Sequence, residues 1–189
     1  MISMMRHKSV LIVVLLSLQA CTAAKEAARH EQVPFTLENV REEVRASFPS
    51  VEQLSTSALA VRLANRDSLV LLDVREPQEY RVSHLPGAVR VDPKTEENSI
   101  APPNDLTNKT LVFYCSVGVR SSKLAQKLQS ELMRKGAISV FNLDGGIFAW
   151  HNEERPLENS NGATDFVHPF DRKYKKLLRR QSLARFEAR

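Results

Sequence analysis

The chain has 189 residues, the length of one ordinary domain with additional segments. Apolar residues make up 42% and charged residues 26%, a composition that excludes a wholly disordered chain. Two cysteines exclude a disulfide scaffold and a four-cysteine zinc site, and the five histidines have no ligand-like spacing. We therefore expect no bound metal, and we also expect no organic cofactor.

The N-terminal segment has the pattern of an export signal. Arg6 and Lys8 precede an apolar run over residues 10–20. As a helix, these eleven residues would be about 16 Å long, too short for a bilayer core of about 30 Å. A basic start followed by a short apolar run that ends in a small residue is typical of a secretory signal. The sequence thus predicts a signal peptide over residues 1–20.

The residues around Cys21 suggest how this signal is processed. The sequence Leu18-Gln-Ala-Cys21 resembles the bacterial lipobox. The resemblance implies cleavage before Cys21 and a doubly acylated anchor on that residue, which would hold the protein to a membrane. Thr22, which follows the cysteine, implies sorting to the outer membrane of a Gram-negative bacterium, on the periplasmic face of the cell envelope. Plain secretion, with a cut after Ala24 that discards Cys21, stays open as an alternative.

A tether and a helix are expected next. Residues 21–34, rich in alanine and charge, are predicted to form the tether. Residues 35–49 are predicted to contain an amphipathic helix that Pro49 ends. Its apolar residues recur at helical spacing: Leu37, Val40, Val44 and Phe48.

The middle of the chain alternates between strand and helix patterns. Ser55 is a plausible N-cap for a helix that runs to about Asn65. A second helix over residues 121–135 carries leucines four residues apart, and Gly136 fits its C-terminal end. The alternation predicts an α/β fold, with a parallel sheet flanked by helices on both faces. The expected strands cover residues 51–54, 69–72, 88–91, 110–114 and 138–141.

Cys115 is the candidate nucleophile of the chain. It directly follows a predicted buried strand and precedes a predicted helix, and ligands bind at the C-terminal ends of parallel strands. Gly118 can take a positive φ, which allows successive backbone N–H groups to converge on one point. The start of the helix adds partial positive charge, which favours a nucleophilic thiolate. Arg120 ends the loop with a planar fork suited to an oxyanion.

At this point the sequence resembles the rhodanese family over about residues 50–155. The resemblance rests on five segments in the right order and spacing. They are LLDVREPQEY at 71–80, HLPGA at 84–88, CSVGVR at 115–120, the helix at 121–136 and GGIFAW at 145–150.

The resemblance implies a sulfurtransferase. Its cysteine, here Cys115, takes a sulfane sulfur from a small donor such as thiosulfate, and a thiol or cyanide acceptor then removes the sulfur. Arg120 is the second catalytic candidate. The amides of the substrate-binding loop would stabilise the terminal sulfur. That loop consists of Ser116, Val117, Gly118 and Val119.

Other marked residues are expected to support the structure. Asp73 is predicted to bind nearby backbone amides rather than to act in catalysis. Arg75 is predicted to pair with Glu79 rather than to point into the mouth of the pocket. His84 is predicted to cap or pack within its loop. Trp150 and Phe148 are predicted to lie in the core, while Gly145 and Gly146 are expected to form a turn.

Three other functions compete with sulfur transfer. Phosphatases of related folds use Cys-x5-Arg, one residue longer than the loop here, and usually carry histidine where this chain has Tyr114. A binding module with the same fold usually lacks the cysteine. A redox thiol oxidised to sulfenic acid would need an external reductant, because the mature chain has no resolving cysteine.

Residues 156–189 are predicted to form a basic tail. Residues 166–189 contain eight basic and two acidic residues, whereas residues 21–165 carry an excess of acidic residues. The chain's basicity therefore belongs to its end and gives no information about the ligand of the main domain. We expect no nucleic-acid partner. An apolar face of a basic helix would either pack on the domain or contact anionic lipid. The residues on that face are Phe170, Tyr174, Leu177 and Leu178.

Overall fold

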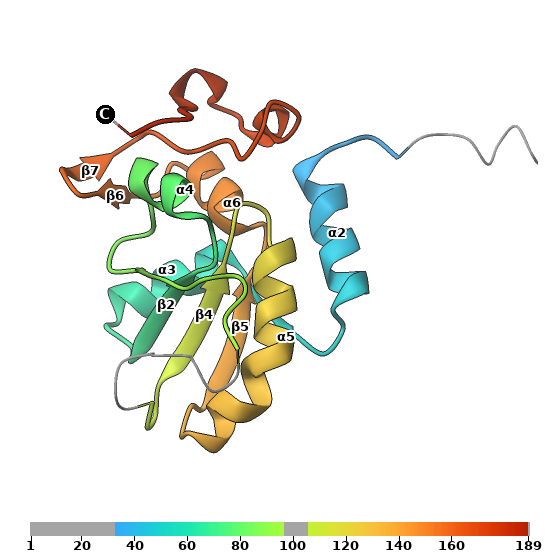
Figure 1. Cartoon of the computed structure of the whole chain (residues 1–189), viewed down its shortest axis with the longest axis vertical. Helices are drawn as coiled ribbons and strands as arrows, with labels where there is room; N and C mark the ends of the chain where they lie inside the picture. Colours follow the sequence, from blue (N-terminus) through green and yellow to red (C-terminus); the bar gives the residue numbers. More distant parts are fainter. Residues whose placement is uncertain (1–32, 97–105, 189) are drawn as a thin grey trace, which may run out of the picture. The chain divides into compact units, whose positions relative to one another are not determined.

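The computed structural model describes residues 33–96 and 106–188 (Figure 1). The predicted signal peptide, Cys21 and almost all of the predicted tether lie outside the described residues. Residues 35–189 form one compact unit, and the elements below all belong to it. None of the helices within the described residues is long and apolar enough to cross a membrane.

A five-stranded sheet lies at the centre of this unit, with the order β1-β5-β4-β2-β3. All neighbouring strands run parallel, which confirms the predicted parallel sheet. Each strand lies within one residue of its predicted position or extends it by at most two residues. The bounds are Glu52–Leu54 for β1, Leu69–Asp73 for β2, Val89–Arg90 for β3, Thr110–Tyr114 for β4 and Ser139–Leu143 for β5.

Three predicted helices are present and begin or end where local chemistry dictates. Helix α2 begins after Thr36, whose side chain accepts a hydrogen bond from the Asn39 amide. Ser55 caps α3 in the same way. Gly136 follows the end of α5 with φ +103°, a conformation that favours glycine. The bounds are Leu37–Ser47 for α2, Thr56–Ala64 for α3 and Val119–Arg134 for α5.

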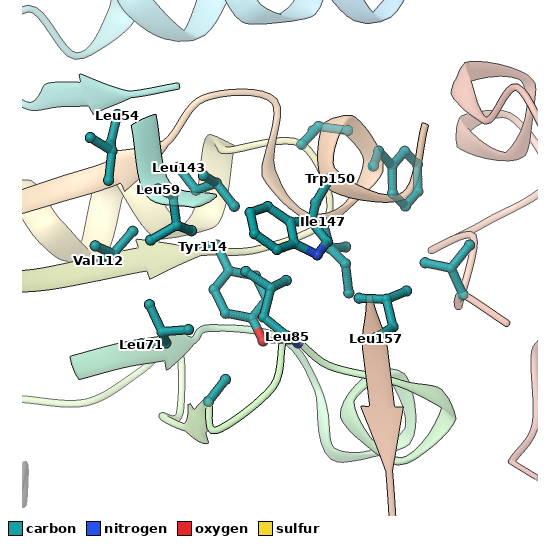
Figure 2. Packing of buried hydrophobic residues seen from close by; sticks show 14 of the residues in the cluster. Leu54, Leu59, Leu71, Leu85, Val112, Tyr114, Leu143, Ile147, Trp150 and Leu157 are labelled. Atoms are coloured by element: carbon teal, nitrogen blue, oxygen red, sulfur yellow. Dashed lines mark hydrogen bonds between the residues drawn. The ribbon is translucent and has the colours of Figure 1, made fainter. Parts of the chain in front are cut away.

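Apolar side chains cover both faces of the sheet. Strand β4 shows the alternation: Leu111 and Phe113 belong to the cluster that includes the leucines of α5. Val112 and Tyr114 belong to the other cluster, together with Leu59 of α3 and Trp150 (Figure 2). The prediction of helices on both faces is confirmed, and so is the burial of Trp150 and Phe148.

Two short helices were not predicted. Helix α4 spans Pro77–Val82, and α6 spans Gly146–Asn152. Glu76 and Glu79 form a reciprocal capping box at the start of α4, with Pro77 at the first helical position. Nearly every residue of α6 is buried, so the segment has no polar face for a helical periodicity to reveal.

The C-terminal region folds onto the domain. Strands β6 (Leu157–Asn159) and β7 (Gly162–Thr164) form an antiparallel hairpin. The prediction of an amphipathic α-helix after residue 169 is wrong, because only the 3₁₀ turns η3 (Tyr174–Leu177) and η4 (Gln181–Leu183) form there. The backbone of Phe170 has φ +64°, which no α-helix contains. Leu177 and Leu178 are buried in the main core, as the packed alternative requires.

Candidate active site

The loop from Cys115 to Arg120 connects β4 to α5. Cys115 is the first residue after the strand, and Gly118 is the N-cap of the helix. The five strands are parallel, so the loop lies at the carboxyl edge of the sheet, where ligands bind in such folds. The structure therefore places the loop where the sequence predicts it, with the Cys115 side chain almost fully buried.

Backbone geometry directs a donor at the sulfur. The Gly118 N–H donates a hydrogen bond to Cys115 Sγ over 3.2 Å. Gly118 has φ +107°, and a β-carbon added there would lie 3.1 Å from Asn142 Nδ2. Glycine is thus needed both for the left-handed backbone and for the close approach to β5.

Opposing effects set the pKa of the Cys115 thiol. Burial raises it, but the charge of Arg120 lowers it, and hydrogen bonds from the Ser121 hydroxyl and from the Ser121 and Val117 amides lower it further. The net result is a pKa below the ordinary value of 9.0. A larger fraction of the thiol is therefore present as the thiolate, the nucleophilic form.

Arg120 forms a two-pronged pair with Glu79 of α4. Arg120 Nη1 donates to Glu79 Oε2 over 2.7 Å, and Nη2 donates to Oε1 over 2.9 Å. The Ser116 hydroxyl donates to Glu79 Oε1 over 3.0 Å, so the carboxylate links both ends of the loop. Burial raises the pKa of Glu79, but the hydrogen bonds and charge of Arg120 lower it more, and the net shift is downward.

Glu79 is a site residue that the sequence interpretation assigned to the wrong partner. Arg75 does not pair with Glu79; its Nη2 lies 2.6 Å from Asp73 Oδ2 and also donates to the Ser83 carbonyl. Asp73 and Arg75 are two residues apart at the end of β2, while Glu79 is held by Arg120. The predicted role of Asp73 is confirmed, since its Oδ1 accepts from the Arg75 amide over 3.1 Å. In the HLPGA segment, His84 stacks on Tyr80 and forms a hydrogen bond with the Tyr80 carbonyl, which confirms its predicted packing role.

The predicted glycine turn lies directly against the active-site loop, and the residues after it are hydrogen-bonded to that loop. Gly145 and Gly146 both have positive φ. The amides of Ile147 and Phe148, just after them, donate to the carbonyls of Cys115 and Ser116 over 2.9 and 3.1 Å. A β-carbon on Gly146 would lie 2.4 Å from the Cys115 carbonyl oxygen. The turn thus brings α6 into direct contact with the loop that carries the thiol.

A second contact fastens this turn to α2. Asp144, directly before the glycines, accepts hydrogen bonds from Arg41 over 2.7 Å and from Arg45 over 2.5 Å. Burial raises the pKa of Asp144, but hydrogen bonds from the two arginines lower it, for a net downward shift. Helix α2 therefore supports the site from outside the sheet.

A pocket of about 130 Å³ lies over the loop. Five of its lining residues belong to the predicted loop, from Cys115 to Arg120 with the exception of Gly118. The remaining two, Phe170 and Tyr174, come from the C-terminal segment. The sequence interpretation noticed both as apolar residues of a supposed helix but did not connect them with Cys115, because nothing local in the sequence indicates that contact.

Comparison with known proteins agrees with this geometry. Residues 56–153 match the family described as "Rhodanese-like domain". A sulfurtransferase of Allochromatium vinosum is 29% identical over 113 residues, which cover 59% of this chain and 99% of that protein. A probable molybdopterin-synthase adenylyltransferase of Porphyra purpurea is 28% identical over 153 residues, 77% of this chain but only 38% of that protein.

Among solved structures, a Rhodopseudomonas palustris protein of unknown function, described as a possible tyrosine phosphatase, is 26% identical. It aligns with a TM-score of 0.49 over 68% of this chain and 98% of its own. The family match spans more than half of the chain and includes β2, the Cys115 loop and the glycine turn. The chain therefore belongs to the rhodanese-like domain family.

Proposed function

We propose that the protein is a sulfurtransferase that carries a sulfane sulfur on Cys115. The observation that supports this most directly is the state of the thiol, which is held in a loop at the carboxyl edge of the sheet. There the Gly118 amide donates to its Sγ, and Arg120 helps to lower its pKa. The donor is thiosulfate or a persulfide, and the acceptor is a thiol or cyanide.

The reaction has two displacement steps. The Cys115 thiolate attacks the sulfane sulfur of thiosulfate, the sulfur–sulfur bond of the donor breaks, and sulfite leaves with the electron pair. Cys115 then carries a terminal persulfide anion. The acceptor nucleophile attacks this outer sulfur, the bond to Cys115 Sγ breaks, and the thiolate is restored.

The loop assists both steps by placing positive potential around the sulfurs. Gly118 N–H already points at Sγ, and the amides of Val117 and Ser121 also favour negative charge there. Donors that are fixed before the reaction stabilise developing charge without reorganisation. Glu79 pairs with both Nη atoms of Arg120, so its role is to position this side chain beside the sulfur.

The test is transfer of sulfur from thiosulfate to cyanide, followed as thiocyanate formation. Cys115→Ser should reduce the rate to the uncatalysed background while the circular dichroism spectrum and melting temperature stay close to wild type, because a serine hydroxyl is not ionised at neutral pH. Cys21→Ser is the matched control and should retain full activity. Wild-type rates in Cys115→Ser would refute the proposal.

We also propose that the protein is exported and anchored to a membrane through lipid on Cys21, on the basis of the lipobox-like sequence at 18–21. Cys21→Ala should then either leave the membrane fraction or retain its uncut signal. Unchanged membrane association together with normal processing would contradict the lipid anchor.

A further inference from the structure

One wall of the pocket comes from outside the family match. That match ends at residue 153, whereas Phe170 and Tyr174 lie in the C-terminal segment. The rings of Phe170 and Tyr174 meet edge to face, with centroids 5.2 Å apart. Arg120 Cζ lies 4.9 Å from the centroid of Phe170, a cation–π contact that joins this wall to the loop.

The ring of Tyr174 is also supported by a residue that lies just before α2. Tyr174 packs edge to face against Phe35, with centroids 5.3 Å apart, and Lys173 lies over the Phe35 ring. The Tyr174 amide also donates to Asp171 Oδ1 over 2.7 Å, which fixes the start of η3. The two rings therefore form a continuous wall, called here the aromatic wall.

The segment that carries the aromatic wall is fastened on both sides. Val167 is fully buried before it, and Leu177 and Leu178 are buried after it. Asn152 of α6 donates to the Leu177 carbonyl over 2.9 Å and accepts from the Arg179 amide over 2.8 Å. A segment held at both ends presents its side chains to the pocket as a fixed surface.

The backbone at Phe170 is strained. Its φ of +64° lies in the left-handed region, which is energetically costly for a bulky side chain. Burial does not explain this cost, because Phe170 stays 42% exposed. Its amide donates a hydrogen bond to His168 Nδ1 over 3.0 Å, a contact that holds the backbone in this conformation.

The resulting pocket is small and mainly apolar. Its volume of about 130 Å³ compares with roughly 300–1,000 Å³ for pockets that enclose drug-sized ligands. Among the lining residues only Arg120 carries a fixed charge, and Glu79 already pairs with it. A compact nucleophile fits within this volume, whereas the body of a larger one would have to lie against the aromatic wall at the mouth of the pocket.

We propose that Phe170 and Tyr174 are specificity-determining residues that limit the sulfur acceptor to compact nucleophiles, such as cyanide and short-chain thiols, and exclude thiols with a bulky body. This inference rests on the proposed sulfur transfer and names its acceptor class. The aromatic wall stands beside the sulfur of Cys115, so an acceptor must pass it to reach the outer sulfur of the persulfide.

Access to Cys115 can be measured without any turnover. The full chain is treated with iodoacetamide and, separately, with a bulky fluorescein maleimide, and peptide mass spectrometry gives the rate of alkylation at Cys115 for each. Phe170→Ala and Tyr174→Ala should raise the rate with the maleimide by at least about tenfold, the scale on which pockets discriminate size. The rate with iodoacetamide should change much less.

Two control variants distinguish the effect of losing a ring from the effect of a general loosening of the C-terminal segment. Phe170→Tyr keeps a ring at the same position and should behave like wild type. Arg172→Gln changes an exposed side chain that lies between the two rings in the sequence but does not line the pocket, and should also leave both rates unchanged. Equal acceleration of both reagents in Phe170→Ala and Tyr174→Ala, or fast maleimide labelling of the wild type, would overturn the proposal.

A kinetic experiment extends the test to the acceptors themselves. With thiosulfate as donor, kcat/KM is compared for cyanide and for glutathione in wild type and Phe170→Ala. The ratio for glutathione over cyanide should rise by about tenfold or more in the variant. If no persulfide forms on wild-type Cys115, sulfur transfer is refuted and with it the acceptor class. If the persulfide forms but the ratio is unchanged, the specificity role of the aromatic wall is refuted, while the proposed sulfur transfer still holds.

Discussion

Two carboxylate–guanidinium pairs lie close together in this molecule, and they differ in what surrounds them. Asp73 and Arg75 are completely buried at the end of β2, with Nη2 and Oδ2 2.6 Å apart. Glu79 and Arg120 make a similarly short contact of 2.7 Å, but the Arg120 side chain is 24% exposed and lines the pocket. Similar chemistry is thus placed once inside the framework and once beside the reactive thiol.

The difference indicates how the fold separates stability from reactivity. Arg75 donates hydrogen bonds to Asp73 and to the Ser83 carbonyl, and these bonds fix the loop between α4 and β3 to the sheet. Arg120 contributes to the lowered pKa of Cys115. We therefore expect substitutions in the first pair to change the free energy of unfolding most, and substitutions in the second to change the reactivity of the thiol.

The largest effect is expected for Asp73→Asn. This change leaves the Arg75 charge buried without its counter-ion, which should lower the free energy of unfolding by about 3–5 kcal/mol in urea titrations. Asp92→Asn is the control, since Asp92 is exposed and lies 4.0 Å from Arg90. The control should change the free energy by less than about 0.5 kcal/mol. Equal losses in the two variants would remove the basis of the comparison.

The next effect concerns Arg120→Met. Burial raises the pKa of Cys115, and the Arg120 charge is the largest of the effects that lower it, so removing the charge should move that pKa upward. The rate of Cys115 alkylation by iodoacetamide, measured against pH, should show a higher midpoint. For sulfur transfer from thiosulfate to cyanide, kcat/KM should fall by a factor of about 10²–10³.

Arg120→Lys serves as the matched variant for that experiment. It keeps the charge but loses the planar fork that grips both oxygens of Glu79. Its midpoint should lie between those of wild type and Arg120→Met. An unshifted midpoint in Arg120→Met would mean that Arg120 only positions the loop.

The smallest effect is expected for Glu79→Gln. The folded-state pKa of Glu79 lies below its ordinary value of 4.5, so its contribution to stability is complete above that value and is lost as pH falls through the folded pKa. The variant should be less stable than wild type by about 1.5–3 kcal/mol at pH 7. This difference should shrink in acid.

The exposed pair between Glu96 and Lys127 provides the control for this prediction. Glu96 is 73% exposed, and Glu96→Gln should leave the free energy of unfolding within about 0.5 kcal/mol at every pH. A constant difference between wild type and Glu79→Gln from neutral pH into acid would contradict the assigned role of the carboxylate.

Much of the fold was predictable because its signals are local. The buried strands are short apolar runs, α2 shows its period in Val40 and Val44, and Ser55 caps α3 with its own side chain. Helices α4 and α6 were missed for physical reasons. The first has only six residues, and the second is buried on nearly all sides. Neither offers the alternation of polar and apolar residues on which the predictions relied.

The residues of the candidate site also fall into those that local sequence predicts and those that only the tertiary fold brings together. The position of Cys115 and the left-handed backbone of Gly118 follow from neighbouring residues. The partner of Arg120 is Glu79, 41 positions earlier, and the aromatic wall comes from Phe170 and Tyr174 in the C-terminal segment. These contacts depend on the tertiary fold. The apolar spacing of the C-terminal segment instead suggested a helix, while burial of Leu177 and Leu178 and the strained backbone at Phe170 gave it another shape.

The central claim is that Cys115 itself carries the transferred sulfur. Incubation of the full chain with thiosulfate, removal of the donor, and peptide mass spectrometry test it directly. The peptide that contains Cys115 should gain the mass of one sulfur atom and should lose it again on addition of cyanide, with release of thiocyanate. A Cys115 that stays unmodified after thiosulfate, while it still reacts with iodoacetamide, would contradict the account.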